Sequence, residues 1–235
     1  MYHTLCRSKQ THAKFSDHIL PYTNVILHKQ IYFMPDSLIV SHYNSPKTPI
    51  KSALLPKLIV FDLDDTLWIG DVDCTYGPPF TCSTRHVVSC RKRTTLPLHP
   101  HVPAILGHLK KSAIPLAIAS RTTRPDWARQ VLDAVRIEGL SLAELSVHAA
   151  WGDCAKTAHF SEIRDVTAVE FPDMIFFDNE MRNITAVKQL GVHCVFCPDG
   201  LTNDLFQASL TEFRKNRLCF CWFITFCHIF ITLIL

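Results

Sequence analysis

The sequence predicts an α/β fold of Rossmann-like architecture, with a parallel sheet flanked by helices. Short apolar runs rich in β-branched and aromatic residues alternate with amphipathic segments of helical length. This alternation is typical of parallel strands joined by crossover helices. Carboxylate, hydroxyl and guanidinium side chains follow three of the apolar runs, at the sheet edge where α/β proteins bind ligands. The 235 residues, 48% of them hydrophobic, are enough to bury one substantial core.

The predicted elements follow one another in a regular order. We expect strands at 58–62, 115–119, 174–178 and 192–196, and helices at 101–111, 126–136, 157–168, 180–190 and 203–215. The run from Leu58 to Phe61 is short, continuous and apolar, as expected of a strand covered on both faces, so we place it centrally. Between 68 and 96 there is no helical period, and the Gly-Pro-Pro turn at 77–79 indicates a short hairpin flap. That segment is too short for a large cap domain.

Two carboxylates follow the first strand and form the most informative pattern in the chain. Asp62 and Asp64 belong to the motif D-x-D-x-T, directly after the apolar run. Side chains two residues apart in a strand point the same way, so both carboxylates can face one cavity. Hard carboxylate oxygens are the ligands that Mg²⁺ prefers. A solvated acidic turn is the alternative for the motif taken alone, and the partners downstream make it the weaker one.

The partners are a hydroxyl, two cations and further carboxylates. Ser120 and Arg121 end the second strand, and Asp178 and Glu180 follow the third. Lys156 precedes an amphipathic segment and on its own would be taken for a solvated surface lysine. A hydroxyl and a cation can hold a phosphoryl group, and another carboxylate can complete a metal site, so the ordered set predicts phosphoryl transfer at Mg²⁺.

These residues occur in the order of the haloacid dehalogenase superfamily. Within it the chain resembles the small eukaryotic magnesium-dependent phosphatases of the acid phosphatase type, over about residues 55–215. More particular matches are the Leu-Trp pair after D-x-D-x-T and the segments GPPF, LHPHVP, ASRT, WGDCAKTAHF and FFDNEMRN. The resemblance implies a magnesium-dependent phosphomonoester hydrolase that works through an aspartyl-phosphate intermediate.

The resemblance also implies roles for individual residues. Asp62 would attack the phosphorus, while Asp64 serves first as acid and then as base. Ser120, Arg121 and Lys156 would bind the phosphoryl group and neutralise its charge.

The implied metal site uses few side chains. Asp62, Asp178, the backbone carbonyl of Asp64 and waters would ligate Mg²⁺. The supporting residues implied nearby are Asn179, Glu180 and Asn183.

The chain departs from the family pattern at two positions. Asp65 stands where these phosphatases usually carry an aromatic or small residue, and it can either raise the affinity for metal or face solvent. Asn179 replaces the second acid of the usual acidic pair. An amide can still accept a hydrogen bond from a metal-bound water, so a weakened or inactive relative is the alternative to a full phosphatase.

The expected substrate is a phosphorylated small molecule or a phosphoprotein. The resembling phosphatases imply phosphotyrosine-like or sugar-phosphate groups. Two alternatives stay open: a phosphotransferase that uses the same phosphoaspartate, and a noncatalytic, membrane-tethered module that binds phospho-ligands. The sequence leaves the oligomeric state open.

Charge and cysteine spacing exclude several other classes. The formal net charge is only +3, and RKR at 91–93 is the longest basic run, so nucleic acid is not an expected partner. The ten cysteines include Cys74, Cys82 and Cys90, whose spacing does not make paired zinc knuckles. The pair Cys194 and Cys197 spans a strand end instead of opening a helix as a redox motif would. We expect buried, reduced thiols and a cytoplasmic protein.

Two segments lie outside the predicted phosphatase domain, which covers 55–216. Residues 1–50 show little periodicity and are expected to form a flexible extension. Residues 217–235 form an apolar tail, and the part from 218 carries no formal charge over 18 residues. It is long enough for a tail anchor that would leave the phosphatase domain on the cytosolic side, and a gene-model extension is the alternative.

Overall fold

The computed structural model describes residues 22–27, 30–35 and 54–234 of the chain, with side chains described for 54–219. The chain divides into two units, residues 1–48 and 49–235. In the first unit, β1 (Tyr22–Leu27) pairs antiparallel with β2 (Gln30–Pro35). Sequence analysis predicted no strand there, because this segment shows little alternation. The flexibility of the remaining N-terminal residues falls outside the described part of the chain.

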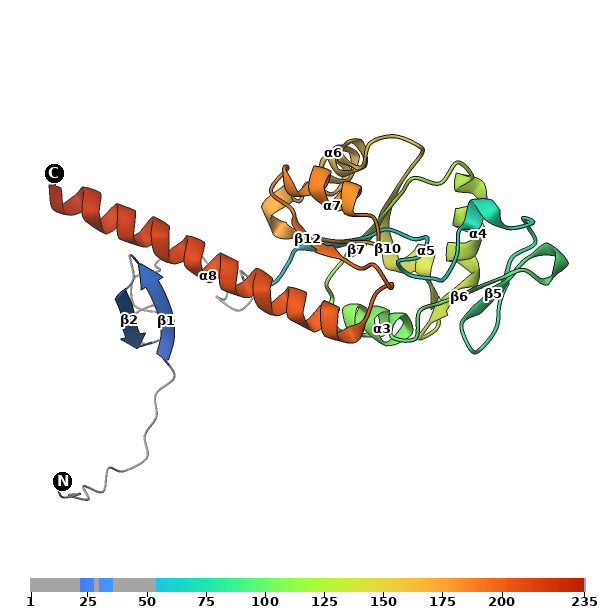
Figure 1. Ribbon diagram of the computed structural model, residues 1–235, viewed down its shortest axis with the longest axis horizontal. Coiled ribbons are helices and arrows are strands. Elements are labelled where there is room, and N and C mark those ends of the chain that lie inside the picture. The colour runs from blue at the N-terminus through green and yellow to red at the C-terminus, as the bar shows by residue number, and fades with distance from the viewer. Residues whose placement is uncertain (1–21, 28–29, 36–53, 235) are drawn as a thin grey trace, which may run out of the picture. The chain divides into compact units, whose positions relative to one another are not determined.

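Five parallel strands form the central sheet of the second unit, in the order β10-β7-β3-β11-β12 (Figure 1). They are β3 (Leu58–Phe61), β7 (Leu116–Ser120), β10 (Ser146–Trp151), β11 (Met174–Asp178) and β12 (His193–Phe196). The central position predicted for β3 is confirmed, since β7 and β11 pair with it on either side. Phe61 lies opposite both Ile118 and Phe177, so these three strands end at nearly the same level.

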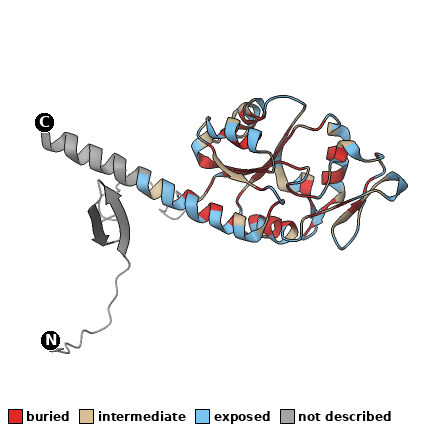
Figure 2. Cartoon of the chain, viewed as in Figure 1, coloured by how far each residue is buried: buried red, intermediate tan, exposed pale blue. Residues whose placement is uncertain are grey.

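Helices cover both faces of this sheet, as predicted. They are α3 (Val102–Ser112), α4 (Pro125–Ala134), the short α5 (Leu142–Leu145), α6 (Lys156–Thr167), α7 (Met181–Lys188) and α8 (Asn203–Ile234). Alternate residues of β3 enter two separate cores: Ile59 and Phe61 pack with α3, α4 and α8, whereas Leu58 and Val60 pack with α6 and α7. The buried strands between exposed helix surfaces are visible in Figure 2. This burial on both faces explains the continuous apolar runs of the sequence.

The predicted hairpin flap is a small antiparallel sheet of three strands. They are β4 (Thr81–Cys82), β5 (Val87–Ser89) and β6 (Thr95–Pro97), preceded by the 3₁₀ turn η1 (Val72–Cys74). A second turn, η2 (Arg91–Arg93), connects β5 to β6. Gly77 allows the flap to pack closely against α4, because a Cβ atom at this position would lie 2.7 Å from the ring of Trp127. The remaining short elements are β8 (Arg136–Ile137), β9 (Leu140–Ser141) and η3 (Phe171–Asp173).

Two elements of the second unit differ from the prediction. The strand β10 was missed, because this edge strand mixes polar and apolar residues that are mostly half-buried. The last helix was expected to end at 215, yet α8 continues to Ile234. Its sequence contains no glycine or proline after Gly200, so nothing in the backbone chemistry ends the helix.

The predicted tail anchor falls mostly beyond residue 219, outside the part of the chain whose side chains are described. A helix with the length and hydropathy needed to cross a bilayer is not found among the described residues.

Seven cysteines lie among residues 54–219, whose side chains are described, and all seven are free. Burial raises the pKa of both Cys194 and Cys197 to about 12, which suits inert thiols. The expectation of buried thiols is wrong for Cys74, Cys154 and Cys219, which are exposed.

Candidate active site

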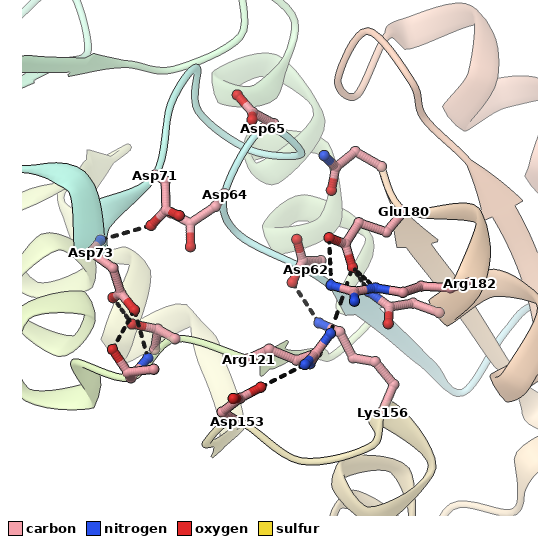
Figure 3. A pocket seen from close by; sticks show the side chains of 14 residues that line it. Asp62, Asp64, Asp65, Asp71, Asp73, Arg121, Asp153, Lys156, Glu180 and Arg182 are labelled. Carbon is pink, nitrogen blue, oxygen red and sulfur yellow. Dashed lines mark hydrogen bonds and ion pairs between the residues drawn. The ribbon is translucent and has the colours of Figure 1, made fainter.

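A polar cavity of about 290 Å³ opens at the carboxyl edge of the sheet (Figure 3). It gathers residues from the ends of β3, β7 and β11, from η1 and from the start of α6. Its lining residues are Asp62, Asp64, Asp65, Asp71, Asp73, Arg121, Thr122, Thr123, Asp153, Lys156, Asn179, Glu180, Arg182 and Asn183. The structure therefore brings together most of the residues selected from the sequence. Ser120 and Asp178 lie directly beside this lining and are buried.

Asp62 occupies the end of the central strand. Its backbone N–H donates to the carbonyl of Phe177 at 3.0 Å, which holds the residue beside β11. One carboxylate oxygen accepts a hydrogen bond from Lys156 Nζ at 2.5 Å, and the hydroxyl of Thr66 lies 3.4 Å from the other. Burial raises the pKa of Asp62, and the ammonium of Lys156 opposes that rise. The ammonium of Lys156 therefore favours the charged form of this carboxylate.

Lys156 is the cation nearest to that carboxylate. It is the first residue of α6 and only 2% exposed, so the sequence-based choice against an ordinary surface lysine agrees with its position. Its ammonium group donates to Asp62 and to the carbonyl of Ala119, and it lies 3.5 Å from Asp178. One ammonium is therefore shared by two carboxylates.

Asp178 is the second of these carboxylates, and it is fully buried at the end of β11. The backbone N–H of Glu180 donates to it at 2.6 Å, and the amide of Asn183 donates at 3.0 Å. Burial raises the pKa of Asp178 to about 7, the negative charge of Asp62 adds to the rise, and Lys156 counteracts it. Asn183 also donates to Glu180 at 2.9 Å, so one amide aligns both acids.

This arrangement suits a magnesium ion. Asp62 and Asp178 come from adjacent strands and carry one more negative charge than Lys156 can neutralise. Carboxylate oxygens are the ligand type that Mg²⁺ prefers, and a divalent cation would favour the charged form of both carboxylates, whose pKa values are raised by burial. Within residues 54–219 no three His, Cys, Asp or Glu side chains form a metal-binding cluster. A site completed by a backbone carbonyl and waters is compatible with that observation.

Asp64 is held apart from this pair. Its Oδ1 accepts hydrogen bonds from the indole of Trp68 at 2.8 Å and from the backbone N–H of Val72 at 2.9 Å. Burial raises the pKa of Asp64 to about 7, although these two hydrogen bonds lower it. A carboxyl group with that pKa can both donate and accept a proton near neutral pH. The Leu-Trp pair of the motif thus supplies the donor that aligns Asp64.

The loop after β7 carries Ser120 and Arg121. Ser120 Oγ accepts a hydrogen bond from the backbone N–H of Thr122 at 3.3 Å, which leaves its own hydroxyl hydrogen available. Arg121 forms an ion pair with Asp153 at 2.5 Å and lies 3.9 Å from Glu180. Figure 3 shows its guanidinium at the cavity, between Asp153 and Glu180. Both residues stand at the end of β7, which pairs with β3, so they lie at the same edge of the sheet as Asp62.

The two departures from the family pattern have different surroundings. Asp65 lies on the cavity wall and accepts a hydrogen bond from the backbone N–H of Gly70 at 2.7 Å, so its carboxylate fastens a turn. Asn179 also faces the cavity, and its side-chain oxygen lies 3.4 Å from the hydroxyl of Thr66. That hydroxyl accepts from the backbone N–H of Asn179 at 3.1 Å. The amide is therefore part of the hydrogen-bond network beside Asp62.

Sequence reasoning missed four charged residues of the cavity, which are Asp71, Asp73, Asp153 and Arg182. Asp153 pairs with Arg121, and Arg182 donates to both oxygens of Glu180 at 2.7 and 2.8 Å. Asp73 binds the loop after β7 from the side of the flap. The sequence held a partial signal for Asp153 and Arg182, since both lie within quoted motifs, whereas Asp73 had none.

Comparisons with known proteins agree with this chemistry. A family model described as Acid Phosphatase matches residues 54–216. Magnesium-dependent phosphatase 1 of Homo sapiens is 38% identical over 165 residues, which cover 70% of this chain and 91% of that protein. A HAD-like hydrolase superfamily protein of Schizosaccharomyces pombe is 33% identical over 176 residues, covering 72% and 98%.

Similarity to solved structures is more distant. A HAD-superfamily hydrolase from Ehrlichia chaffeensis is 11% identical, with a TM-score of 0.48, and the match covers 70% of this chain and 98% of that one. The family model and the two curated relatives therefore carry the assignment.

Proposed function

The chain belongs to the acid phosphatase family, within the magnesium-dependent phosphatases of the haloacid dehalogenase superfamily, and on that premise we propose that Asp62 is its nucleophile. The observation that supports this most directly is the shared ammonium of Lys156, which lies 2.5 Å from Asp62 and 3.5 Å from Asp178. It leaves a net negative pair at the strand ends, and Mg²⁺ is the cofactor of this family. When bound, Mg²⁺ supplies the positive charge that reduces repulsion between a carboxylate and a phosphate anion.

The first half-reaction transfers the phosphoryl group to the enzyme. Asp62 attacks the phosphorus, an oxygen–phosphorus bond to the carboxylate forms, and the bond to the leaving oxygen breaks. Asp64 gives its proton to that leaving oxygen, a role suited to a carboxyl group whose pKa is about 7. The hydroxyl of Ser120 and the ammonium of Lys156 hold the equatorial oxygens, and Arg121 adds positive charge at the cavity mouth.

The second half-reaction returns Asp62 to its starting state. Asp64, now deprotonated, takes a proton from a water molecule as that water attacks the phosphorus. The bond between Asp62 and phosphorus breaks, and inorganic phosphate leaves. Asn179 and Glu180 assist from the same edge of the sheet by fixing Thr66 and Asn183.

We propose that the substrates are phosphomonoesters whose phosphoryl group is exposed, on small molecules or on proteins. Between β3 and α3, residues 62–101 contribute only the turns η1 and η2 and the three short strands of the flap, without a covering domain. An uncovered cavity admits a phosphoryl group that projects from a larger body.

The decisive experiment uses p-nitrophenyl phosphate, with Mg²⁺ and with chelator, on the wild-type chain and on Asp62→Asn. Metal-dependent turnover that is lost in the variant, together with a phosphoryl group trapped on Asp62 by acid quench, would support the proposal. An added alcohol tests for phosphotransfer, because nitrophenol would then exceed free phosphate. Binding of phosphate without turnover in a folded wild-type protein would contradict the proposal and favour a noncatalytic module.

A further inference from the structure

The turn η1 contacts two parts of the proposed machinery at once. The backbone N–H of Val72 donates to Asp64 at 2.9 Å, while the next residue, Asp73, turns its carboxylate toward the loop after β7. Asp71 caps the turn by accepting from the backbone N–H of Asp73 at 2.7 Å. Figure 3 shows Asp71 and Asp73 on the side of the cavity away from Glu180 and Arg182. This turn therefore lies between the acid and the phosphoryl-binding loop.

Asp73 uses both of its carboxylate oxygens on that loop. Oδ2 accepts the backbone N–H and the hydroxyl of Thr123, each at 2.7 Å, and Oδ1 accepts the hydroxyl of Thr122. Burial favours a higher pKa for Asp73, but the hydrogen bonds from Thr122 and Thr123 outweigh it and hold the pKa below its ordinary value. These three hydrogen bonds to one half-buried carboxylate hold the loop after β7 against η1, and the negative charge of Asp73 strengthens them.

The hydrogen bonds of Asp73 continue to Ser120 through Thr122. The hydroxyl of Thr122 donates to Asp73 and accepts from the backbone N–H of Arg124 at 3.0 Å, so this buried side chain has a fixed orientation. The backbone N–H of the same residue donates to Ser120 Oγ at 3.3 Å. Because Ser120 accepts there, its hydroxyl hydrogen points elsewhere and is free to donate to a phosphoryl oxygen.

We propose that Asp73 is a positioning residue that fixes the turn 121–123, and with it the Ser120 hydroxyl and the Arg121 guanidinium, for binding of the phosphoryl group. This inference rests on the proposed function, since it assigns Asp73 a task in the same reaction. Asp73 contacts neither substrate nor metal in this scheme, and it acts through Thr122 and Thr123. The same turn holds Asp64, so η1 sets the separation between the acid and the phosphoryl-binding loop.

The test compares the full-length wild-type chain with Asp73→Ala at saturating Mg²⁺. Two quantities are measured: kcat and KM for p-nitrophenyl phosphate, and the inhibition constant of inorganic phosphate. We expect kcat/KM to fall about 10- to 100-fold and phosphate inhibition to weaken, because a loop displaced by a fraction of an ångström loses aligned donors. Asp73→Asn should recover most of the loss, since its amide oxygen still accepts from the Thr123 N–H. The matched control is Asp126→Ala, which removes an exposed carboxylate from the first turn of α4.

A second variant separates positioning from stability. Thr123→Val deletes one donor to Asp73 and keeps the backbone, and it should lower kcat/KM alone but add nothing in the Asp73→Ala background. Wild-type kinetics and phosphate inhibition in folded Asp73→Ala, or in Thr123→Val if the alanine variant does not fold, would overturn the inference. Wild-type protein without metal-dependent turnover would instead overturn the proposed function, and the inference with it.

Discussion

The two ends of the central sheet each carry a buried carboxylate bound by basic side chains, but their charges do not balance in the same way. At the amino end, Asp173 forms ion pairs with Lys57 at 2.7 Å and with Arg217 of α8, so one anion has two cations. At the carboxyl end, Asp62 and Asp178 share the single ammonium of Lys156.

The difference indicates that the cluster around Asp173 stabilises the fold, whereas the cluster around Lys156 is suited to binding a cation and to catalysis. The cations around Asp173 join the starts of β3 and β11 to α8 and leave no carboxylate uncompensated. The pair at the carboxyl end keeps an excess negative charge, and the pKa of Asp178 rises to about 7 as a result of burial and that charge. An excess of buried negative charge destabilises a folded protein unless a bound cation neutralises it.

The largest expected effect is on turnover when the proposed nucleophile is removed. Asp62→Asn should reduce kcat at least about a thousandfold, because the amide cannot form the phosphoryl-enzyme bond. The same substitution at the other cluster, Asp173→Asn, should leave kcat within about twofold, since Asp173 lies at the opposite end of the sheet from the proposed reacting groups. Steady-state hydrolysis of p-nitrophenyl phosphate measures both. Equal losses in the two variants would show that the clusters do not differ in the proposed way.

The next largest effect follows removal of the shared ammonium. Lys156→Met should lower kcat/KM by about 10²- to 10³-fold, as for the loss of one donor to the transition state. Without Mg²⁺ it should also destabilise the fold by about 3 to 5 kcal/mol, because two buried carboxylates lose their cation. Lys57→Met is the matched control, and since that side chain is 62% exposed we expect little change. Urea unfolding with chelator and with Mg²⁺ gives the stability values.

Metal binding should stabilise only the carboxyl end. Saturating Mg²⁺, at about 100 times its Kd, should add about 2.7 kcal/mol to the free energy of unfolding of the wild-type chain. Asp178→Asn should reduce this increment, whereas Asp173→Asn should retain it in full. Thermal unfolding at a series of Mg²⁺ concentrations measures the increment. An unchanged increment in Asp178→Asn would remove Asp178 from the set of proposed ligands.

The smallest effect concerns the structural cluster. Asp173→Asn should lower the free energy of unfolding by about 1 to 3 kcal/mol, because Arg217 and Lys57 lose a carboxylate whose side chain is only 10% exposed. The loss should be the same with chelator and with Mg²⁺. A loss that Mg²⁺ alters would mean that the two ends of the sheet are coupled.

Local sequence signals were enough to predict the centre of the site. Asp62 and Asp64 could be placed together because they follow one strand at a spacing of two, and the level ends of β3, β7 and β11 then bring Ser120 and Asp178 alongside. Lys156 could be selected only from its order among the other motifs, since nothing local distinguishes it from an exposed lysine.

Contacts between loops could not be predicted in the same way. Asp73 lies 49 residues before Thr122, in a segment without helical or strand periodicity, so no sequence pattern predicts the hydrogen bond between them. Asp153 lies 32 residues after Arg121, at the end of β10, an edge strand that the sequence did not reveal. Such contacts depend on how the loops fold over the sheet. The periodicity of apolar and polar residues along the sequence does not predict that arrangement.

The burial of Lys156 in the first turn of α6 has a consequence for protein engineering. The positive end of a helix is an unfavourable place for an ammonium group, and the Lys156 ammonium also lies 5.7 Å from the centroid of the Phe176 ring. Replacing buried ion pairs by well-packed apolar residues often increases stability by about 1 to 4 kcal/mol. Replacing Asp62, Lys156 and Asp178 together by apolar residues should therefore give a protein without catalytic activity but with a higher melting temperature.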